Sequence, residues 1–107
     1  MVASRQIYWA NLDPPSGRRP VIVLTRDAVA GVLNRVVVAQ ITRTVRGLRS
    51  EVPVGPTEGL PGESVISCDN LLAVPTHQLD PKPVGTLGPV KQRQLDRALR
   101  YSLAIRG

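Results

Sequence analysis

Apolar and polar residues alternate over short distances along the first two thirds of the chain, a pattern that predicts strands. Branched and aromatic residues gather in residues 6–12, 21–25 and 35–42, and the third range has the most continuous apolar run. The first strand must stop at the Asp-Pro-Pro of residues 13–15, because proline lacks the N–H that a sheet ladder needs. We therefore expect three strands here, with residues 35–42 at the centre of a sheet.

Shorter apolar runs follow, separated by the turn-rich segments "GPTEGLPGE" and "PTHQLDPKP". Many short strands between Gly- and Pro-rich turns favour a small, curled antiparallel sheet or barrel. Residues 27–34 predict an irregular connection or one helical turn, since Gly31 weakens a longer helix. The further strands expected are residues 51–54, 64–68, 71–74 and 84–87.

The C-terminal part of the chain has a different periodicity, which predicts one amphipathic helix between Pro89 and Ile105. Pro89 suits the first turn of a helix. A single helix of this kind lays its apolar stripe on the sheet, and it is not a helix-turn-helix, so reading of the DNA major groove loses support. The apolar residues that recur at three- and four-residue steps are Leu95, Ala98, Leu99 and Leu103.

Length and charge narrow the class of protein. A chain of 107 residues is long enough for one core, so residues 1–107 are expected to form a single domain. Fourteen Lys and Arg residues against eight Asp and Glu residues leave a net charge of +6. Such an excess suggests a polyanionic partner, most simply nucleic acid, and the alternative is a charge that serves solubility.

The small number of histidine and cysteine residues argues against several kinds of metal and cofactor site. One histidine and one cysteine cannot build a Cys/His zinc site, and no Gly-rich phosphate loop is present, so neither a metal nor a cofactor is expected. The apolar runs are too short to cross a bilayer, and residues 1–7 lack the apolar region of a secretory signal. A lone Cys68 cannot form an internal disulfide, which favours the cytoplasm.

Five motifs follow one another over nearly the whole chain: "IYWANLDP" (7–14), "RRPVIVLT" (18–25), "VVVAQIT" (36–42), "GLPGESVISCDN" (59–70) and "GTLGPVKQRQLDRALRYSL" (85–103). In order and spacing they resemble the MazF/PemK family of bacterial toxin endoribonucleases. The resemblance implies an SH3-like barrel with a C-terminal helix, a homodimer, and a dedicated acidic antitoxin. It also implies cleavage of single-stranded RNA at short sequences without a metal ion, giving 2′,3′-cyclic phosphate and 5′-hydroxyl ends. The substrate that the resemblance implies is messenger RNA, with ribosomal or transfer RNA as alternatives.

Two catalytic residues are implied by this resemblance. Arg19, directly before a Pro-Val step, matches family arginines that serve in proton transfer and phosphate stabilisation. Thr42, in "QIT", matches a family threonine whose hydroxyl contacts the scissile phosphate. Without the resemblance, Arg19 has the pattern of a surface arginine beside a strand, and Thr42 that of an ordinary strand threonine.

The remaining candidates are binding residues. Four arginines are expected to contact backbone phosphates, although at least one of them is expected to be only a solvated loop charge. Asp69 and Asn70 can read a base edge by hydrogen bonding, or form an ordinary turn pair. The four arginines are Arg18, Arg43, Arg46 and Arg49.

Two other functions compete with an endoribonuclease toxin. The first is a non-catalytic SH3-like module that binds nucleic acid through its basic face, which needs only the net charge. The second is a CcdB-like gyrase inhibitor, which shares the barrel but depends on the end of the last helix. Here that end, "LAIRG", has no distinctive feature, whereas the Arg-Pro-Val and Ile-Thr elements are present.

Overall fold

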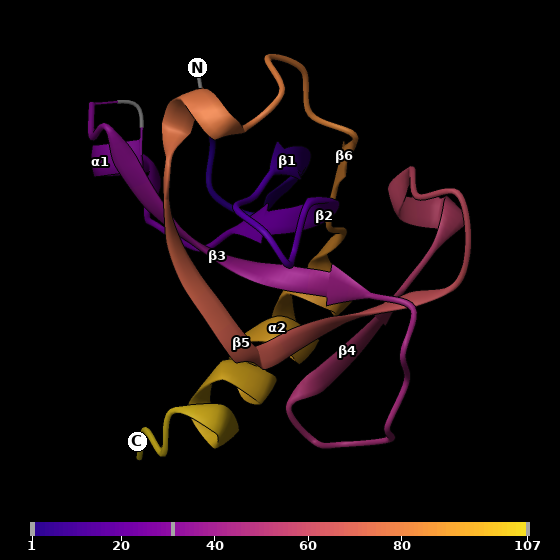
Figure 1. The fold of residues 1–107 in the computed structure, drawn as a ribbon. Coiled ribbons are helices and arrows are strands. Elements are labelled where there is room, and N and C mark those ends of the chain that lie inside the picture. The colour runs from indigo at the N-terminus through magenta and orange to yellow at the C-terminus, as the bar shows by residue number, and fades with distance from the viewer. Residues whose placement is uncertain (1, 31, 107) are drawn as a thin grey trace.

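The computed structural model describes residues 2–30 and 32–106 and shows a curled six-stranded sheet with one C-terminal helix (Figure 1). Every neighbouring pair of strands is antiparallel, in the order β4-β5-β3-β2-β1-β6. The expected fold class, a small curled antiparallel sheet with a C-terminal helix, is confirmed. The elements are β1 (Gln6–Asn11), β2 (Arg18–Val23), α1 (Asp27–Ala30), β3 (Arg35–Thr42), β4 (Glu51–Val54), η1 (Pro56–Glu58), β5 (Ser64–Pro75), η2 (Thr76–Gln78), β6 (Gly85–Thr86) and α2 (Pro89–Ser102).

β2 begins at Arg18, three residues before the start that the sequence predicts, so Pro20 lies inside the strand and not before it. β2 pairs with β1 from Arg18 to Ile22, but its pairing with β3 starts only at Val21. The first residues of β2 therefore have one sheet neighbour, and a proline is tolerated where a strand has an open edge. As a result Arg18 and Arg19 belong to the strand itself and not to the loop before it.

β5 is one bent strand where the sequence predicts two. Gln40 of β3 pairs with Ser67, whereas the preceding Ala39 pairs with Leu71, so Cys68, Asp69 and Asn70 form a bulge between the two halves. A bulge of this kind bends a strand and redirects its side chains. The N-terminal half of β5 pairs with both β3 and β4, and the C-terminal half continues along β3 alone.

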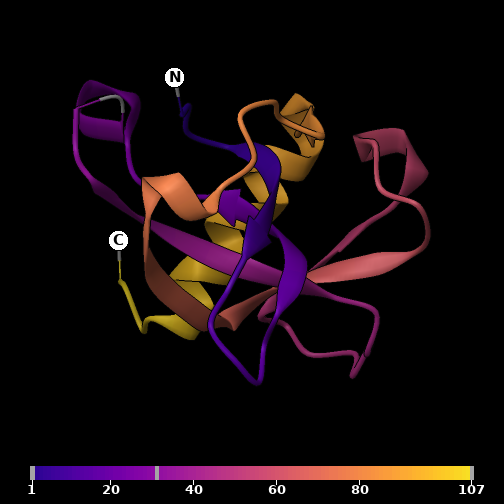
Figure 2. The same cartoon turned by 45° about the horizontal axis from the view of Figure 1, so that its top comes forward.

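The sheet buries apolar side chains on both faces. On one face Ile7, Ile22 and Ile41 pack with Leu95 and Ala98 of α2, and Figures 1 and 2 show α2 lying across the sheet. On the other face Val21 and Val38 pack with Leu79, in the segment after β5, and with other residues of a second cluster. β3 lies between β5 and β2, so it is an inner strand, and its residues 38–41 are all buried, as its continuous apolar run predicts.

The helix is shorter than its periodicity suggests. α2 ends at Ser102, and Leu103 is 51% exposed although the apolar stripe predicts that it packs on the sheet. Residues 27–30 form one helical turn, as expected, and Cys68 is fully buried as a small core residue. Among the described residues, neither helix has the length and apolar character needed to cross a membrane.

Candidate functional site

A hollow of about 310 Å³ lies where β2, β3 and the bulge of β5 meet, and we call it the β2–β3–β5 hollow. Five of the eight predicted site residues line it, although they come from four separate segments of the chain. The hollow is walled by the loop between β3 and β4, which contributes Thr44, Arg46 and Leu48. The five predicted residues are Arg19, Thr42, Arg46, Asp69 and Asn70.

Arg19 and Thr42 meet because of the register between β2 and β3. The β2–β3 pairing ends at Val21 and Gln40, and Arg19 and Thr42 each lie two residues beyond that last pair. Because side chains alternate between the faces of a strand, both point to the same side as Val21, away from α2. The strand frame thus fixes the relative position of a guanidinium and a hydroxyl.

The polar groups of both residues are partly engaged and partly free. Arg19 Nε donates to the carbonyl oxygen of Ser16 at 3.3 Å, which turns the side chain toward the β1–β2 connection. Within the described residues its two terminal amino groups have no protein acceptor. Thr42 Oγ1 accepts the N–H of Thr44 at 3.1 Å, so the hydroxyl proton is left to be donated into the hollow.

The wall of the hollow is built around one carboxylate, that of Glu51. Its Oε1 accepts three successive backbone N–H groups, from Arg46 (3.1 Å), Gly47 (2.9 Å) and Leu48 (3.2 Å). Gly47 has a φ of +72°, a conformation that favours glycine and lets the turn wrap around the oxygen. Successive N–H groups form an anion-binding concavity, so Glu51 holds the turn that carries Arg46.

Asp69 is also held, by two hydroxyls from distant segments. Ser50 Oγ donates to its Oδ2 at 2.5 Å and Ser102 Oγ donates to its Oδ1 at 2.6 Å. The hydrogen bond from Ser102, followed by that from Ser50, lowers the pKa of the Asp69 carboxyl from its usual value. Asp69 therefore ties the bulge of β5 to the β3–β4 loop and to the end of α2.

Asn70 connects the β2–β3–β5 hollow to a neighbouring one. Its Oδ1 accepts from Nε2 of Gln40 at 3.3 Å, and Gln40 is 6% exposed. Gln40 lines a second hollow of about 400 Å³, which we call the Gln40 hollow, beside Asp13, Ser16 and Arg35. Within the described residues the amide nitrogen of Asn70 has no acceptor, so it is available as a donor at the boundary between the two hollows.

Comparison with known proteins identifies the family. A family model described as "PemK-like, MazF-like toxin of type II toxin-antitoxin system" matches residues 3–103. The chain belongs to this family. Endoribonuclease MazF3 of Mycobacterium tuberculosis is 49% identical over 75 residues, which are 70% of this chain and 70% of that protein. The expectation of a toxin endoribonuclease of this family is thereby confirmed.

Solved structures agree with this assignment. The Mycobacterium tuberculosis toxin MazF-mt6 is 39% identical, with a TM-score of 0.89 over 96% of this chain and all of that one. An endoribonuclease in complex with its cognate antitoxin, from a mycobacterial species, has a TM-score of 0.86 over 100% of this chain and 99% of that one. At 22% identity the second likeness shows the shared fold alone.

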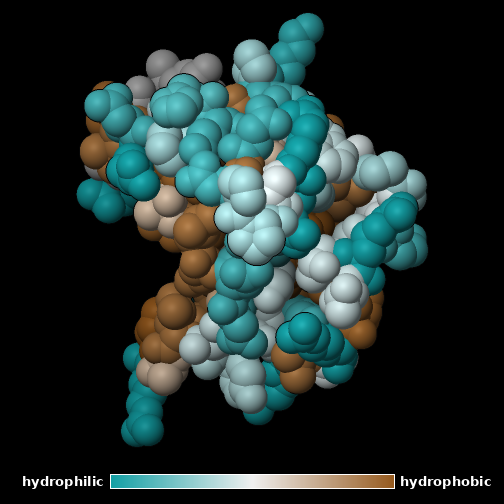
Figure 3. Space-filling model, in the orientation of Figure 1, coloured by the Kyte–Doolittle hydropathy of each residue, from teal (hydrophilic) through white to brown (hydrophobic). Residues whose placement is uncertain are grey.

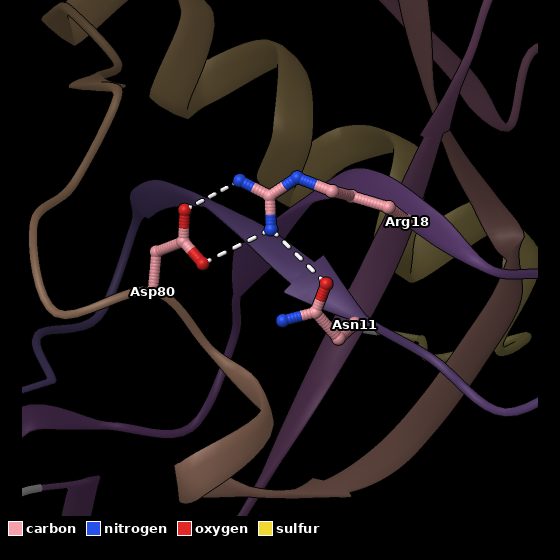
Figure 4. A network of polar contacts seen from close by, with 3 residues as sticks. All are labelled: Asn11, Arg18 and Asp80. Atoms are coloured by element: carbon pink, nitrogen blue, oxygen red, sulfur yellow. Dashed lines mark hydrogen bonds and ion pairs between the residues drawn. The ribbon is translucent and has the colours of Figure 1, made fainter.

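Arg18, which we expected to contact phosphate, lies outside the β2–β3–β5 hollow of this MazF-family chain. Its guanidinium donates to both carboxylate oxygens of Asp80, at 3.1 and 2.6 Å, and to Oδ1 of Asn11 at 3.1 Å (Figure 4). It also lies 5.5 Å from the centre of the Trp9 ring. The hydrogen bond from Arg18 lowers the pKa of the Asp80 carboxyl, so this arginine is occupied within the protein.

Arg43 and Arg49 also lie outside the β2–β3–β5 hollow. The guanidinium of Arg43 lies against Gly62, in the space that a β-carbon at this position would take up. Arg49 lies over the ring of Tyr101 of α2, 4.4 Å from its centre, and both line a separate hollow on the helix side. The roles of Arg18, Arg43 and Arg49 toward RNA stay predictions.

The structure adds residues that the sequence did not single out. Three side chains hold the site in place by hydrogen bonds although they belong to none of the predicted site residues: those of Ser50, Glu51 and Ser102. For Glu51 a signal exists, since a carboxylate four residues after the glycine of a basic turn can cap that turn. Ser102 has no such signal, because it lies 33 residues from Asp69. Within the described residues, no group of three His, Cys, Asp or Glu side chains is arranged to hold a metal ion.

Proposed function

We propose that this chain cuts single-stranded RNA in the β2–β3–β5 hollow, at short sequences and without a metal ion, through attack by the RNA's own 2′-hydroxyl. The observation that carries the proposal is the meeting of Arg19 and Thr42 in one hollow. The substrate class rests on relatives named endoribonucleases, and messenger RNA is the expected substrate, with ribosomal and transfer RNA as alternatives.

The reaction needs no water and no cofactor. The 2′-oxygen forms a bond to phosphorus while the bond from phosphorus to the 5′-oxygen breaks. One proton leaves the 2′-hydroxyl and one is delivered to the 5′-oxygen, giving a 2′,3′-cyclic phosphate and a 5′-hydroxyl. A guanidinium remains protonated in proteins, so Arg19 acts as a donor that stabilises the charge growing on the phosphorane oxygens. The Thr42 hydroxyl donates to the same group.

The ends of the RNA fragments and the effect of chelation test this proposal. Purified protein is incubated with a long unstructured RNA, with and without excess EDTA, and the fragment ends are identified by mass spectrometry. Cleavage is expected to continue in EDTA and to leave cyclic phosphate and 5′-hydroxyl ends. A 5′-phosphate, or loss of cleavage on chelation, would contradict the mechanism. His77→Gln is expected to have little effect, since His77 is exposed and lies outside the hollow.

The boundary between the two hollows is where we propose that bases are read. The Asn70 amide nitrogen donates to a base edge, while its bond from Gln40 fixes the orientation of the amide. Asp69 is committed to two hydroxyls, so its contribution is to place Asn70 next to it. Asn70→Ala is expected to relax the sequence preference in cleavage maps of a long RNA. An unchanged cleavage map would contradict this role.

We propose that two copies of the chain associate through an apolar hollow of about 420 Å³. Leu24, Leu71 and Leu103 line it, and brown side chains gather over β5 and toward the C-terminus in Figure 3. A contiguous apolar surface of this kind is typical of an interface. Light scattering is expected to give a dimer, and Leu103→Asp a monomer. Val32→Asp, at another exposed apolar residue, is the control, and a monomeric wild type would overturn the proposal.

We also propose that an acidic antitoxin segment neutralises the chain. The net charge of +6 favours rapid encounter with an anionic peptide, and apolar side chains of that peptide supply the slow dissociation. A disordered segment can run along several hollows at the cost of ordering. A saturating amount of the cognate segment is expected to suppress RNA binding and cleavage together. A complex that binds and cuts RNA like the free protein would contradict a shared surface.

A further inference from the structure

A second basic hollow lies behind the wall of the proposed cleavage site, and we call it the helix hollow. It has a volume of about 270 Å³ and lies between the β3–β4 loop and α2. Arg49 comes from the loop and Arg97 from the helix, and both side chains are exposed. The residues lining it are Arg49, Glu51, Gln94, Arg97, Ala98 and Tyr101.

Three links place the helix hollow directly beside the β2–β3–β5 hollow. Glu51 lines both, so one side chain is the shared wall. Asp69, in the first hollow, accepts from Ser50 and Ser102. These two serines are the chain neighbours of Arg49 and Tyr101, which line the second hollow. An RNA strand that leaves the β2–β3–β5 hollow over the β3–β4 loop would therefore reach the helix hollow.

The charges of the helix hollow suit an anion. Within the described residues, neither Arg49 nor Arg97 has a carboxylate within ion-pair distance, in contrast to Arg18 and Arg5, which are paired with Asp80 and Asp96. The carboxylate of Glu51 already accepts backbone N–H groups of the loop, which reduces its repulsion of a phosphate. Tyr101 supports the Arg49 guanidinium from one face at 4.4 Å and leaves its N–H groups at the rim available as donors.

The geometry points to a second RNA subsite, in which Arg49 and Arg97 bind a backbone phosphate of a nucleotide that flanks the one cut in the β2–β3–β5 hollow. The inference rests on the proposed function for the identity of the polyanion. Contacts to phosphate add affinity without reading sequence. The expected consequence is that affinity rises with RNA length until the strand reaches both hollows.

The test compares RNA length, salt dependence and a matched charge change. The probes are 2′-O-methyl oligoribonucleotides of about four and about twelve nucleotides, which cannot be cut because they lack the attacking hydroxyl, so the result is independent of whether the chain cleaves RNA. The variant is Arg49→Gln with Arg97→Gln. The control is Arg93→Gln with Arg106→Gln, which removes the same charge at two exposed arginines that do not line the helix hollow. Binding is measured by fluorescence anisotropy, and folding by circular dichroism.

The helix-hollow variant is expected to bind the longer probe about three- to tenfold more weakly than wild type, as for exposed ion pairs. The slope of the logarithm of its binding constant against the logarithm of salt concentration should become shallower by about 0.7 for each phosphate that the variant no longer neutralises. The control is expected to keep the rise in affinity with length. Equal weakening in variant and control, or a variant that keeps the full rise with length, would overturn the subsite. Weaker binding of an acidic peptide with unchanged RNA binding would also overturn it. Failure of the wild type to cut any RNA would refute the proposed function. The binding comparison could still be interpreted in that case, because its probes are not cleaved.

Discussion

The hydroxyl of Ser102 donates to the carboxylate of Asp69, with Oγ and Oδ1 2.6 Å apart, which ties the bulge of β5 to the last residue of α2. This hydrogen bond is the largest cause of the lowered pKa of Asp69. Asp69 thus anchors the bulge of β5, and its role as a base reader stays a prediction. Removing its donor is the most direct way to measure what the anchor contributes.

Ser102→Ala is expected to raise the pKa of Asp69 toward its usual value, because the charged form loses its strongest donor. A lowered folded pKa stabilises the protein above the unfolded pKa, and this contribution is lost as the pH falls through the folded value. The stability difference between wild type and Ser102→Ala should therefore shrink in acid. Carbon NMR of the Asp69 carboxyl measures the pKa, and the control is Ser67→Ala, at a serine of β5 that lines the β2–β3–β5 hollow. An unchanged Asp69 pKa in Ser102→Ala would contradict the assignment.

Arg19→Ala is expected to reduce RNA cleavage by about 10² to 10³, the usual cost of one transition-state donor, while leaving the fold intact. Thr42→Ala should fall in the same range or lose less. Initial rates on a long unstructured RNA measure the effect. Arg93→Ala, on the exposed side of α2, is the matched arginine control. Cleavage at the normal rate by a folded Arg19→Ala protein would remove Arg19 from the mechanism.

Glu51→Ala is expected to loosen the turn at Arg46, since three N–H groups lose their common acceptor. The backbone amides of Arg46, Gly47 and Leu48 should exchange with solvent faster, and KM for RNA should rise severalfold with a smaller change in kcat. Glu51→Gln keeps an oxygen acceptor and should restore part of the protection. Glu63→Ala, at an exposed glutamate outside the hollow, is the control. If exchange at these amides stayed slow in Glu51→Ala, the turn would have another support.

The Cys68 thiol is expected to resist alkylation in the folded protein. Burial, followed by the nearby charge of Asp69, raises its pKa to about 11. At pH 8 the thiolate is then about a hundredfold scarcer than for a free cysteine, and the side chain is 0% exposed. Mass spectrometry after iodoacetamide treatment measures the rate, and denaturant should restore it. Rapid labelling of the native protein would show that the bulge opens.

Much of the sheet is predictable from sequence because its strands are fixed by local apolar runs. β3 and β4 have the predicted bounds, Arg35–Thr42 and Glu51–Val54. β5 was predicted as two strands, since polar Asp69 and Asn70 interrupt the apolar pattern and a bulge has the same local signature as a turn. The start of β2 was missed because the rule that proline ends a strand does not anticipate a strand with one open edge.

The candidate site is less predictable, because it depends on pairings between distant segments. Arg19 and Thr42 were found through family motifs, and the register of β2 and β3 explains why they meet. A count of arginines could not separate Arg46, which lines the β2–β3–β5 hollow, from Arg18, which is bound by Asp80. Such differences arise from the partner that each guanidinium finds in the fold. The roles of the individual site residues stay predictions until the variants are measured.

The irregularity of β5 also determines how freely related sequences can change in length. Removing one residue from Cys68–Asn70, with the pairing up to Ser67 kept, would reverse the facing of every later side chain in the strand, so Val74 would take the exposed place of Ala73 and Pro75 the buried place of Val74. The β1–β2 connection carries no such penalty, because residues 12–17 lie outside the paired ladder, which ends at Asn11 and Arg18. Divergence by insertion or deletion, and with it new target sequences, is therefore expected in the loops around the hollows, while the length of β5 stays constant.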